Sequence, residues 1–211
     1  EPTSLDKFLF ENGLMHETLL IEQLQKDGKS IKRLSGEMTD EAFQHTILAM
    51  KEGVDYIYQG SFFHKDLCGS ADLLERVEEP SDLGDWSYIP IECKLSSHPK
   101  PIYLIQSCVY CELLEPILGA IPKSFKLYLG GQKFEESPNG YRTSDFWMWY
   151  EQIRNRYREF VSTFNSEKEP QYRPGDHGPW QELVDKKLED QMDLALVAGM
   201  RKSQREKLRS S

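Results

Sequence analysis

The chain has 211 residues, of which 38% are hydrophobic and 11% aromatic, enough to bury one sizeable core. No run of about 18 apolar residues and no basic N-terminal region followed by an apolar one is visible, so we expect a cytoplasmic protein without a membrane span or secretory signal. The formal net charge of −9 argues against a surface that binds nucleic acid throughout, although carboxylates gathered around a divalent metal ion are compatible with DNA binding.

The cysteine usage fits a reducing compartment. There are four cysteines, too few and too central in the chain for a disulfide framework. Cys108 and Cys111 form a C-x-x-C inside an apolar, helix-like run with no second pair elsewhere. We therefore expect them to pack in the core rather than to bind zinc.

The first third of the chain is predicted to be helical. Residues 13–28 place leucines at helical spacing and end at Gly28, which is a good C-terminal stop. Residues 39–53 form a second predicted helix, with Thr39 or Asp40 as N-cap and a glycine past its end.

Extended segments follow these helices. Enrichment in aromatic and β-branched residues predicts antiparallel strands over 54–67 and 70–79, with a turn at Cys68 and Gly69. After a loop, residues 86–96 are predicted to form the next strand. These three strands supply most of the expected sheet.

The second half of the chain alternates between helix and strand. We predict a strongly apolar helix over 102–119, a strand over 124–131, a turn-rich connection over 132–141, and a long helix over 144–164 capped by Ser144. This order indicates an α/β fold with a central mixed sheet flanked by helices, plus helical N- and C-terminal extensions.

The C-terminal part is predicted to be helical and ends in basic residues. A loop over 165–179 leads into a helical stretch over 180–200, and the last eleven residues carry five basic groups and one acidic group. This tail either binds phosphate non-specifically or continues into a missing domain. We expect one domain over 1–211, with a core at about 10–135 and a helical extension at about 143–211, as a segment of a longer protein.

The stretch "IECKLS" places a carboxylate and an ammonium two residues apart on a predicted strand. Residues i and i+2 of a strand share a face and lie roughly 6.5–7 Å apart, so Glu92 and Lys94 point together while Cys93 points the other way. Taken alone, this spacing describes an ordinary ion pair.

Further polar residues lie on the neighbouring elements. Asp72 lies in "GSAD" on the preceding strand, while Gln106 and Tyr110 are four residues apart on one face of the following helix. His16 and Glu17 stand together on the first helix. Hydrolysis of phosphodiesters uses such a mixture, since carboxylate oxygens hold Mg²⁺ or Mn²⁺ and a lysine orients or deprotonates water, or neutralises developing charge.

In these motifs the chain resembles a family. "GSAD", "IECK" and "QSCVY" match the G-x-x-D, E-x-K and Q-x-x-x-Y motifs of the RecB-like branch of the PD-(D/E)XK nuclease superfamily, over roughly residues 10–130. That branch includes nuclease domains of bacterial recombination enzymes, phage lambda exonuclease and CRISPR-adaptation nucleases. The resemblance implies a restriction-endonuclease-like core and a metal-dependent nuclease, with DNA as partner and Mg²⁺ or Mn²⁺ as cofactor.

The resemblance also implies roles for single residues. Asp72 and Glu92 correspond to metal ligands, joined by the backbone carbonyl of Cys93, and Lys94 to the catalytic lysine. His16 is expected to approach the same metal, and Glu17 is an acidic neighbour counted with the catalytic group. Gln106 and Tyr110 would position the DNA backbone or support the site.

The chain departs from the family's pattern in one respect. Many RecB-like nucleases hold an iron–sulfur cluster through one upstream cysteine and three near the C-terminal end. This chain has no cysteine after residue 111, so we expect no iron–sulfur cluster. Members of this branch are often joined to helicase or other nucleic-acid domains, so a fused or associated helicase is an expected partner.

Each of these assignments has a plainer alternative. His16 alone is more often a surface or core histidine, and Gln106 and Tyr110 also fit the face of a packed helix. Aromatic and basic residues alternate in the helix over 144–164, which would either stack bases or pack on the core. Lys100, in the loop before the apolar helix, would either reach phosphate or remain solvated.

The expected function is a metal-dependent deoxyribonuclease, acting as an exonuclease on single-stranded DNA or DNA ends. Two alternatives remain open. One is a non-catalytic nucleic-acid-binding module of a larger helicase or nuclease assembly, and the other is a structure-specific endonuclease. The presence of Asp72, Glu92 and Lys94 together weighs against the first, because a degenerate copy would be expected to lose at least one of them.

Overall fold

The computed structural model describes residues 3–131, 139–167, 175 and 177–209. The chain divides into two compact units, Glu1–Arg158 and Glu159–Ser211. None of the helices in these described ranges is both long and apolar enough to cross a membrane.

The first unit is built on a six-stranded mixed sheet with strand order β1-β2-β3-β4-β5-β6. The pairs β1–β2 and β4–β5 are parallel and the others antiparallel. The strands are β1 (Ile31–Arg33), β2 (Tyr56–His64), β3 (Leu67–Val77), β4 (Ser87–Lys94), β5 (Ser124–Leu129) and β6 (Asn139–Arg142). The flanking helices are α1 (Ser4–Lys26), α2 (Asp40–Glu52), α3 (Pro101–Leu118) and α4 (Ser144–Ser162). The α/β class with a central mixed sheet is thereby confirmed.

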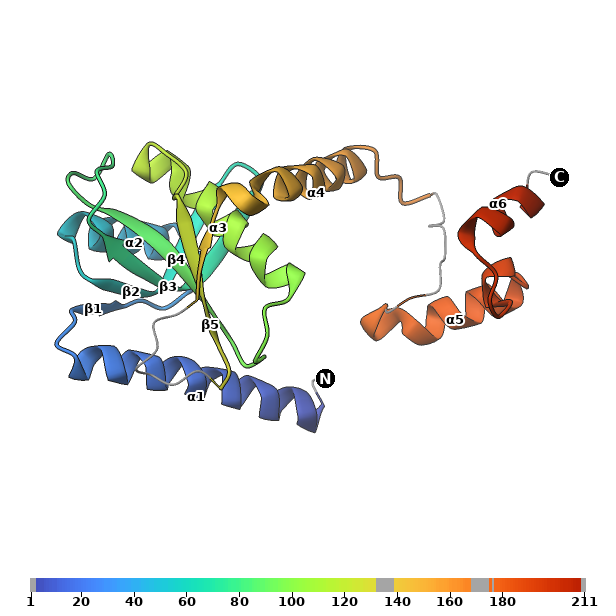
Figure 1. The fold of residues 1–211 in the computed structure, drawn as a ribbon, viewed down its shortest axis with the longest axis horizontal. Coiled ribbons are helices and arrows are strands. Elements are labelled where there is room, and N and C mark those ends of the chain that lie inside the picture. Colours follow the sequence, from blue (N-terminus) through green and yellow to red (C-terminus); the bar gives the residue numbers. More distant parts are fainter. Residues whose placement is uncertain (1–2, 132–138, 168–174, 176, 210–211) are drawn as a thin grey trace. The chain divides into compact units, whose positions relative to one another are not determined.

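Helices cover both faces of the sheet (Figure 1). On one face, Leu20 of α1 packs in a cluster with Leu73, Ile91 and Cys93 of the central strands. On the other face, α2 and α3 cover a larger apolar cluster that includes Leu74. β4 lies between the two layers and is buried along almost its whole length, as expected for a central strand covered on both faces.

A third apolar cluster joins α3 to α4. The buried Cys108 and Cys111 of α3 pack there with Phe125 of β5 and Tyr150 of α4. Both cysteines have free thiols, and burial raises the pKa of each. The expectation that this C-x-x-C packs in the core is confirmed.

Some predicted boundaries were wrong. α1 begins at Ser4, nine residues before the predicted start, because Thr3 and Asp6 form a capping box there. The β2–β3 turn lies at Lys65 and Asp66, with Lys65 at φ 55°, so the predicted turn residues Cys68 and Gly69 belong to β3. The edge strands β1 and β6, of three and four residues, were not predicted, because strands so short leave little sequence pattern.

The second unit begins at Glu159, near the end of α4, and continues through short helices. They are η1 (Gly178–Trp180), α5 (Gln181–Asp190), η2 (Leu194–Leu196) and α6 (Lys202–Arg209). Val184 and Leu188 are its buried apolar residues among those described. The helical stretch predicted over 180–200 is interrupted after Asp190. Parts of the predicted loop over 165–179 and of the connection over 132–141 lie outside the described residues.

Candidate active site

Glu92 and Lys94 lie at the C-terminal end of β4. The side chain of Glu92 is only 1% exposed, and the Lys94 ammonium donates a hydrogen bond to its Oε1 atom. Burial acts to lower the pKa of Lys94, but the attraction of Glu92 and Asp72 outweighs it and leaves this pKa above its ordinary value. The pair is therefore not an exposed surface ion pair, and the lysine carries its charge beside a buried carboxylate.

The pairing of strands β3 and β4 ends next to Asp72. The antiparallel ladder ends at the pair Leu73 and Ile91. Beyond it, the backbone N–H of Cys93 donates to Oδ2 of Asp72 at 2.8 Å, in place of a strand-to-strand bond. The carboxylate of Asp72 is thus held between the two strands, next to Glu92.

Burial makes both carboxyl groups harder to ionise. Burial, with the charge of Asp72, raises the pKa of Glu92 to about 8. Burial likewise raises the pKa of Asp72, despite the Cys93 N–H and the charge of Lys94. Oε2 of Glu92 is buried and accepts no hydrogen bond from the described residues. Two carboxylates in this position either share a proton or bind a cation.

This donor set fits a hard divalent cation. Mg²⁺ is commonly held by one or two carboxylates while its other positions go to water and substrate phosphate. Asp72 and Glu92 supply such carboxylates, and Oε2 of Glu92 has no donor in the part of the chain that the structure describes. Within the described ranges, no three side chains of His, Cys, Asp or Glu converge as a ready-made metal cage. The fit therefore depends on the two carboxylates of β3 and β4.

His16 lies against β5. Its ring stacks on Tyr128 at a centroid distance of 4.4 Å, and its Nε2 atom lies 3.4 Å from the Tyr128 carbonyl oxygen. Burial lowers the pKa of His16, although the contact with this carbonyl opposes the shift. The described contacts of His16 are thus with Tyr128 rather than with the two carboxylates.

Glu17 approaches the carboxylates from α1. It accepts hydrogen bonds from the Tyr58 hydroxyl at 2.9 Å and from Nε2 of Gln59 at 3.3 Å. Burial and the charge of Asp72 raise the pKa of Glu17, while these hydrogen bonds and Lys94 oppose the shift. Glu17 is therefore electrostatically coupled to the site formed by β3 and β4.

Gln106 and Tyr110 support the strand that carries Asp72. The buried Tyr110 hydroxyl donates to the carbonyl of Ser70 at 2.8 Å and accepts from Nε2 of Gln106 at 3.1 Å. A Cβ atom on Gly69 would lie 3.0 Å from the Tyr110 ring. The glycine of G-x-x-D thus lets the tyrosine of Q-x-x-x-Y approach β3, which connects the two motifs physically.

Tyr58 and Gln59 were missed by sequence reasoning. Gln59 adopts φ 57°, a left-handed conformation that costs a non-glycine residue roughly 1–3 kcal/mol. It lies between the β2–β3 pairs Tyr58–Leu73 and Gly60–Ala71, which places it across from Asp72. The nearest signal in the sequence is that the polar Gln59 directly follows the aromatic and aliphatic run Tyr56–Tyr58.

Arg154 and Arg158 of α4 form ion pairs with residues of the first unit. Arg154 pairs with the buried Glu112 of α3, and Arg158 makes two hydrogen bonds to Asp66 at 2.6 and 2.7 Å. The buried Tyr150 packs on the α3 cysteines. These contacts favour the packing alternative for this helix over base stacking.

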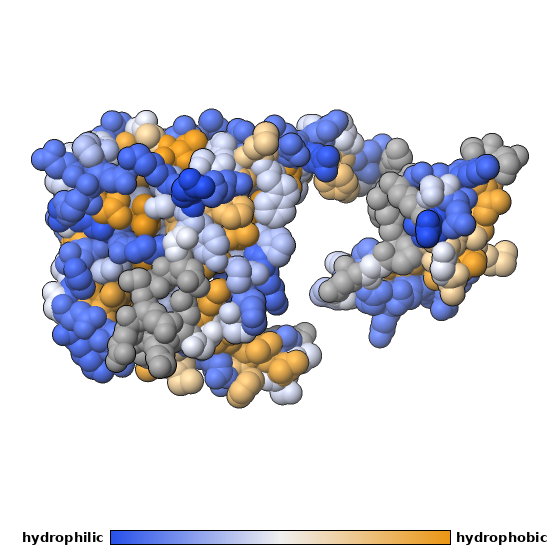
Figure 2. Space-filling model, viewed as in Figure 1, coloured by the Kyte–Doolittle hydropathy of each residue, from blue (hydrophilic) through white to orange (hydrophobic). Residues whose placement is uncertain are grey.

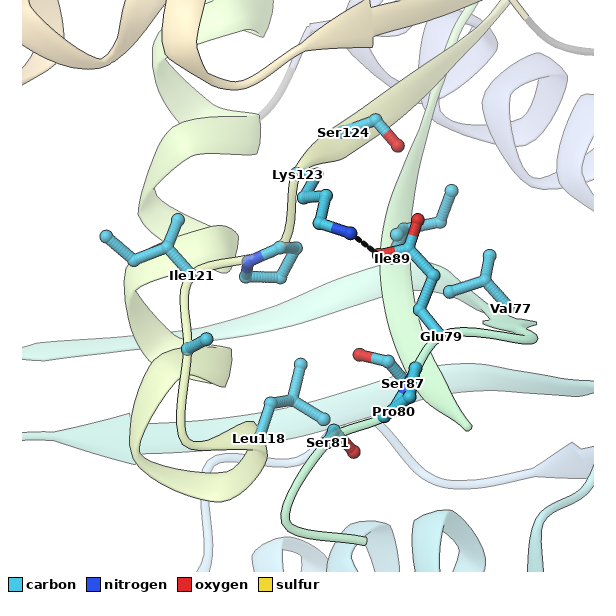
Figure 3. A pocket seen from close by; sticks show the side chains of 12 residues that line it. Val77, Glu79, Pro80, Ser81, Ser87, Ile89, Leu118, Ile121, Lys123 and Ser124 are labelled. Atoms are coloured by element: carbon cyan, nitrogen blue, oxygen red, sulfur yellow. Dashed lines mark ion pairs between the residues drawn. The ribbon is translucent and has the colours of Figure 1, made fainter. Parts of the chain in front are cut away.

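A small pocket lies at the other end of β4, where the strand begins (Figure 3). Its volume is about 90 Å³, and it is closed on one side by an ion pair of 2.8 Å between Lys123 and Glu79. It is too small for a nucleotide, and its other polar groups are serines. It carries no acid–base set comparable to Asp72, Glu92 and Lys94.

Comparison of the sequence with known protein families and with curated proteins finds no match.

Proposed function

We propose that this chain is a metal-dependent deoxyribonuclease of the RecB-like branch of the PD-(D/E)XK superfamily, acting on single-stranded DNA or DNA ends. One observation supports it most: two adjacent strands bring Asp72, Glu92 and Lys94 together, and one buried carboxylate oxygen has no donor among the described residues. The motif order and the α/β class agree with the family, whose core carries its site on such strands.

Each residue of the candidate site has its own role in the proposed phosphodiester hydrolysis. Asp72 and Glu92 would hold Mg²⁺ or Mn²⁺, which would supply Lewis-acid chemistry there by making a water more acidic and offsetting charge on the phosphate. Lys94 holds an ammonium group next to the carboxylates, where it orients the attacking water or neutralises developing charge. Glu17 adds a further acidic group from α1, and Tyr110 fixes the strand that carries Asp72.

A cleavage assay tests the proposal. End-labelled single-stranded, double-stranded and circular DNA are incubated with Mg²⁺, Mn²⁺ or EDTA. Cleavage is expected only with metal, and Asp72→Asn and Lys94→Ala are expected to lower its rate by about 10²–10⁴-fold.

Lys126→Ala is the matched control. Lys126 lies on β5, and its side chain is 23% exposed, against 25% for Lys94; its partner is Glu75. This variant is expected to keep the parental rate.

The products distinguish the alternatives. Loss of linear but not circular DNA indicates an exonuclease, and nicked circles indicate the structure-specific endonuclease. Bound but uncut DNA under every metal condition would overturn hydrolysis and favour the non-catalytic binding module. Cleavage by Lys94→Ala at the parental rate would remove Lys94 from the mechanism.

A further inference from the structure

A groove of about 590 Å³ opens beside the candidate active site. It lies between the N-terminal half of α1, the end of β4 and the loop into α3. Glu17 and Lys94 line it together with residues that have no part in the proposed chemistry. The groove is therefore continuous with the candidate site, and its volume is typical of a ligand pocket.

One wall of the groove is apolar and exposed. Leu9, Phe10 and Leu14 of α1 are 49%, 70% and 49% exposed, and Figure 2 shows apolar side chains gathered over this end of the helix. They continue the helical stripe that buries Leu20 and Ile21 against the sheet further along α1. Exposed apolar side chains that border a polar site mark a ligand groove more often than a bare surface.

The opposite wall is aromatic and cationic. The Nζ atoms of Lys94 and Lys100 lie 5.5 and 5.9 Å from the centroid of the Tyr103 ring. Lys100 is exposed and makes no side-chain cap on α3. The groove thus offers flat apolar surfaces to a ring and two ammonium groups to an anion.

We propose that this groove binds one or two unpaired nucleotides of a single-stranded nucleic acid next to the scissile phosphate, an inference that rests on the proposed function. Bases stack on Phe10 and Tyr103, and Lys100 contacts a backbone phosphate. Paired bases within a duplex cannot present their faces to these side chains, whereas every unpaired base has a free π-face. The groove selects unpaired ends by this means.

Binding without cleavage tests the groove separately from hydrolysis. The full chain in EDTA is titrated into a labelled oligothymidylate and, separately, into a labelled duplex hairpin, with fluorescence anisotropy as the readout. Phe10→Ala is expected to raise the Kd for the oligothymidylate about fivefold or more, and not the Kd for the hairpin. Lys100→Ala is expected to lower the slope of log K against log salt by about 0.7. Phe8→Ala, on the same helix and 60% exposed but outside the groove, is expected to leave both Kd values unchanged.

A second pair of variants avoids any loss of packing. Gly13 lines the groove, and a Cβ atom there would meet nothing within 4 Å. Gly13→Glu and Gly13→Gln place similar side chains in the groove and differ in charge, and both replace a mid-helix glycine with a better helix former. Weaker oligothymidylate binding by Gly13→Glu than by Gly13→Gln is expected, because only the carboxylate repels phosphate.

The outcomes separate the groove from the chemistry. If Phe10→Ala and Phe8→Ala bind alike, or if the variants weaken hairpin and oligothymidylate equally, the groove inference is overturned even where DNA is cut. If Phe10→Ala alone weakens oligothymidylate binding while no metal supports cleavage, the groove stands and the proposed hydrolysis fails.

Discussion

Ionising Glu92 costs more free energy in the folded protein than in the unfolded chain. Its burial and the charge of Asp72 raise its pKa to about 8, against 4.5 for the free group. Between these two pH values the folded state keeps a proton on Glu92 that the unfolded chain has released. The stabilisation that comes from this proton is complete below about pH 4.5 and is lost as pH rises through about 8. In EDTA, the free energy of unfolding should therefore fall over this window, and less so in Glu92→Gln.

Urea unfolding at about pH 5 and about pH 8 measures this difference. A cation bound by the ionised carboxylates should offset the loss, so Mn²⁺ should raise the unfolding midpoint more at the higher pH. Identical pH slopes for the parent and Glu92→Gln would show that burial does not control this carboxyl group.

Gln59 combines backbone strain with contacts in the site. Its φ of 57° is unfavourable, its Nε2 atom donates to Glu17, and its Oε1 atom accepts from Ser70. Gln59→Gly should relieve strain and keep stability within about 1 kcal/mol, while the lost hydrogen bond to Glu17 lowers the cleavage rate about tenfold. Asparagine tolerates the same backbone conformation, but its side chain is shorter and does not reach Glu17. Gln59→Asn should therefore show the same loss of cleavage rate.

Cleavage rates and urea midpoints measured together decide the role of Gln59. A stable Gln59→Gly variant with the parental rate would mean that this strained residue does not position Glu17 for the reaction.

At the scale of elements, a charged network joins α3 to α4. Glu112, which is 5% exposed, accepts hydrogen bonds from Tyr150 and Arg154. Burial acts to raise the pKa of Glu112, but these bonds outweigh it and leave the pKa lowered. In Glu112→Ala, the mostly buried Arg154 guanidinium loses its buried carboxylate partner. The free energy of unfolding should therefore fall by about 3–5 kcal/mol.

Glu151→Ala is the matched control for this network. Glu151 also pairs with Arg154, but its side chain is 43% exposed, so its loss should cost less than about 1 kcal/mol. Urea unfolding of both variants provides the measurement, and equal losses would argue that the buried network does not fix α4 on α3.

The sequence predicted elements where local chemistry determines them. The apolar run of α3 and the caps of α2 are local signals, and both helices were found within a residue or two of their predicted bounds. The start of α1 was missed because its exposed leucines and phenylalanines obscure the amphipathic pattern. The turn at Lys65 was missed because glycine is the usual residue at positive φ and Gly69 lay nearby.

The candidate site was partly predictable for the same reason. Asp72, Glu92 and Lys94 belong to short motifs that can be recognised from residue spacing alone, and the structure brings the three residues together. The left-handed backbone of Gln59 arises only when β2 and β3 pair around Asp72, so no local pattern reports it. The stacking of His16 on Tyr128 likewise depends on how α1 crosses the sheet.

At the scale of the whole molecule, the candidate site belongs to the first unit. Glu17, Asp72, Glu92 and Lys94 all precede Arg158, which ends that unit. Among the described residues, the buried apolar side chains of the second unit are Val184 and Leu188. The buried cluster next to the site, which includes Leu73, Ile91 and Cys93, is formed by residues of the first unit.

A chain that ends at Phe164 should therefore fold as the full chain does and show the metal-dependent cleavage proposed for the full chain. It retains α4 and its contacts with α3. The removed segment carries nine basic and nine acidic residues, so the net charge of the protein stays at −9 and general repulsion of DNA does not change. Thermal unfolding and metal-dependent cleavage of both chains make the comparison. Loss of either property would contradict this expectation and show that folding or cleavage requires residues 165–211.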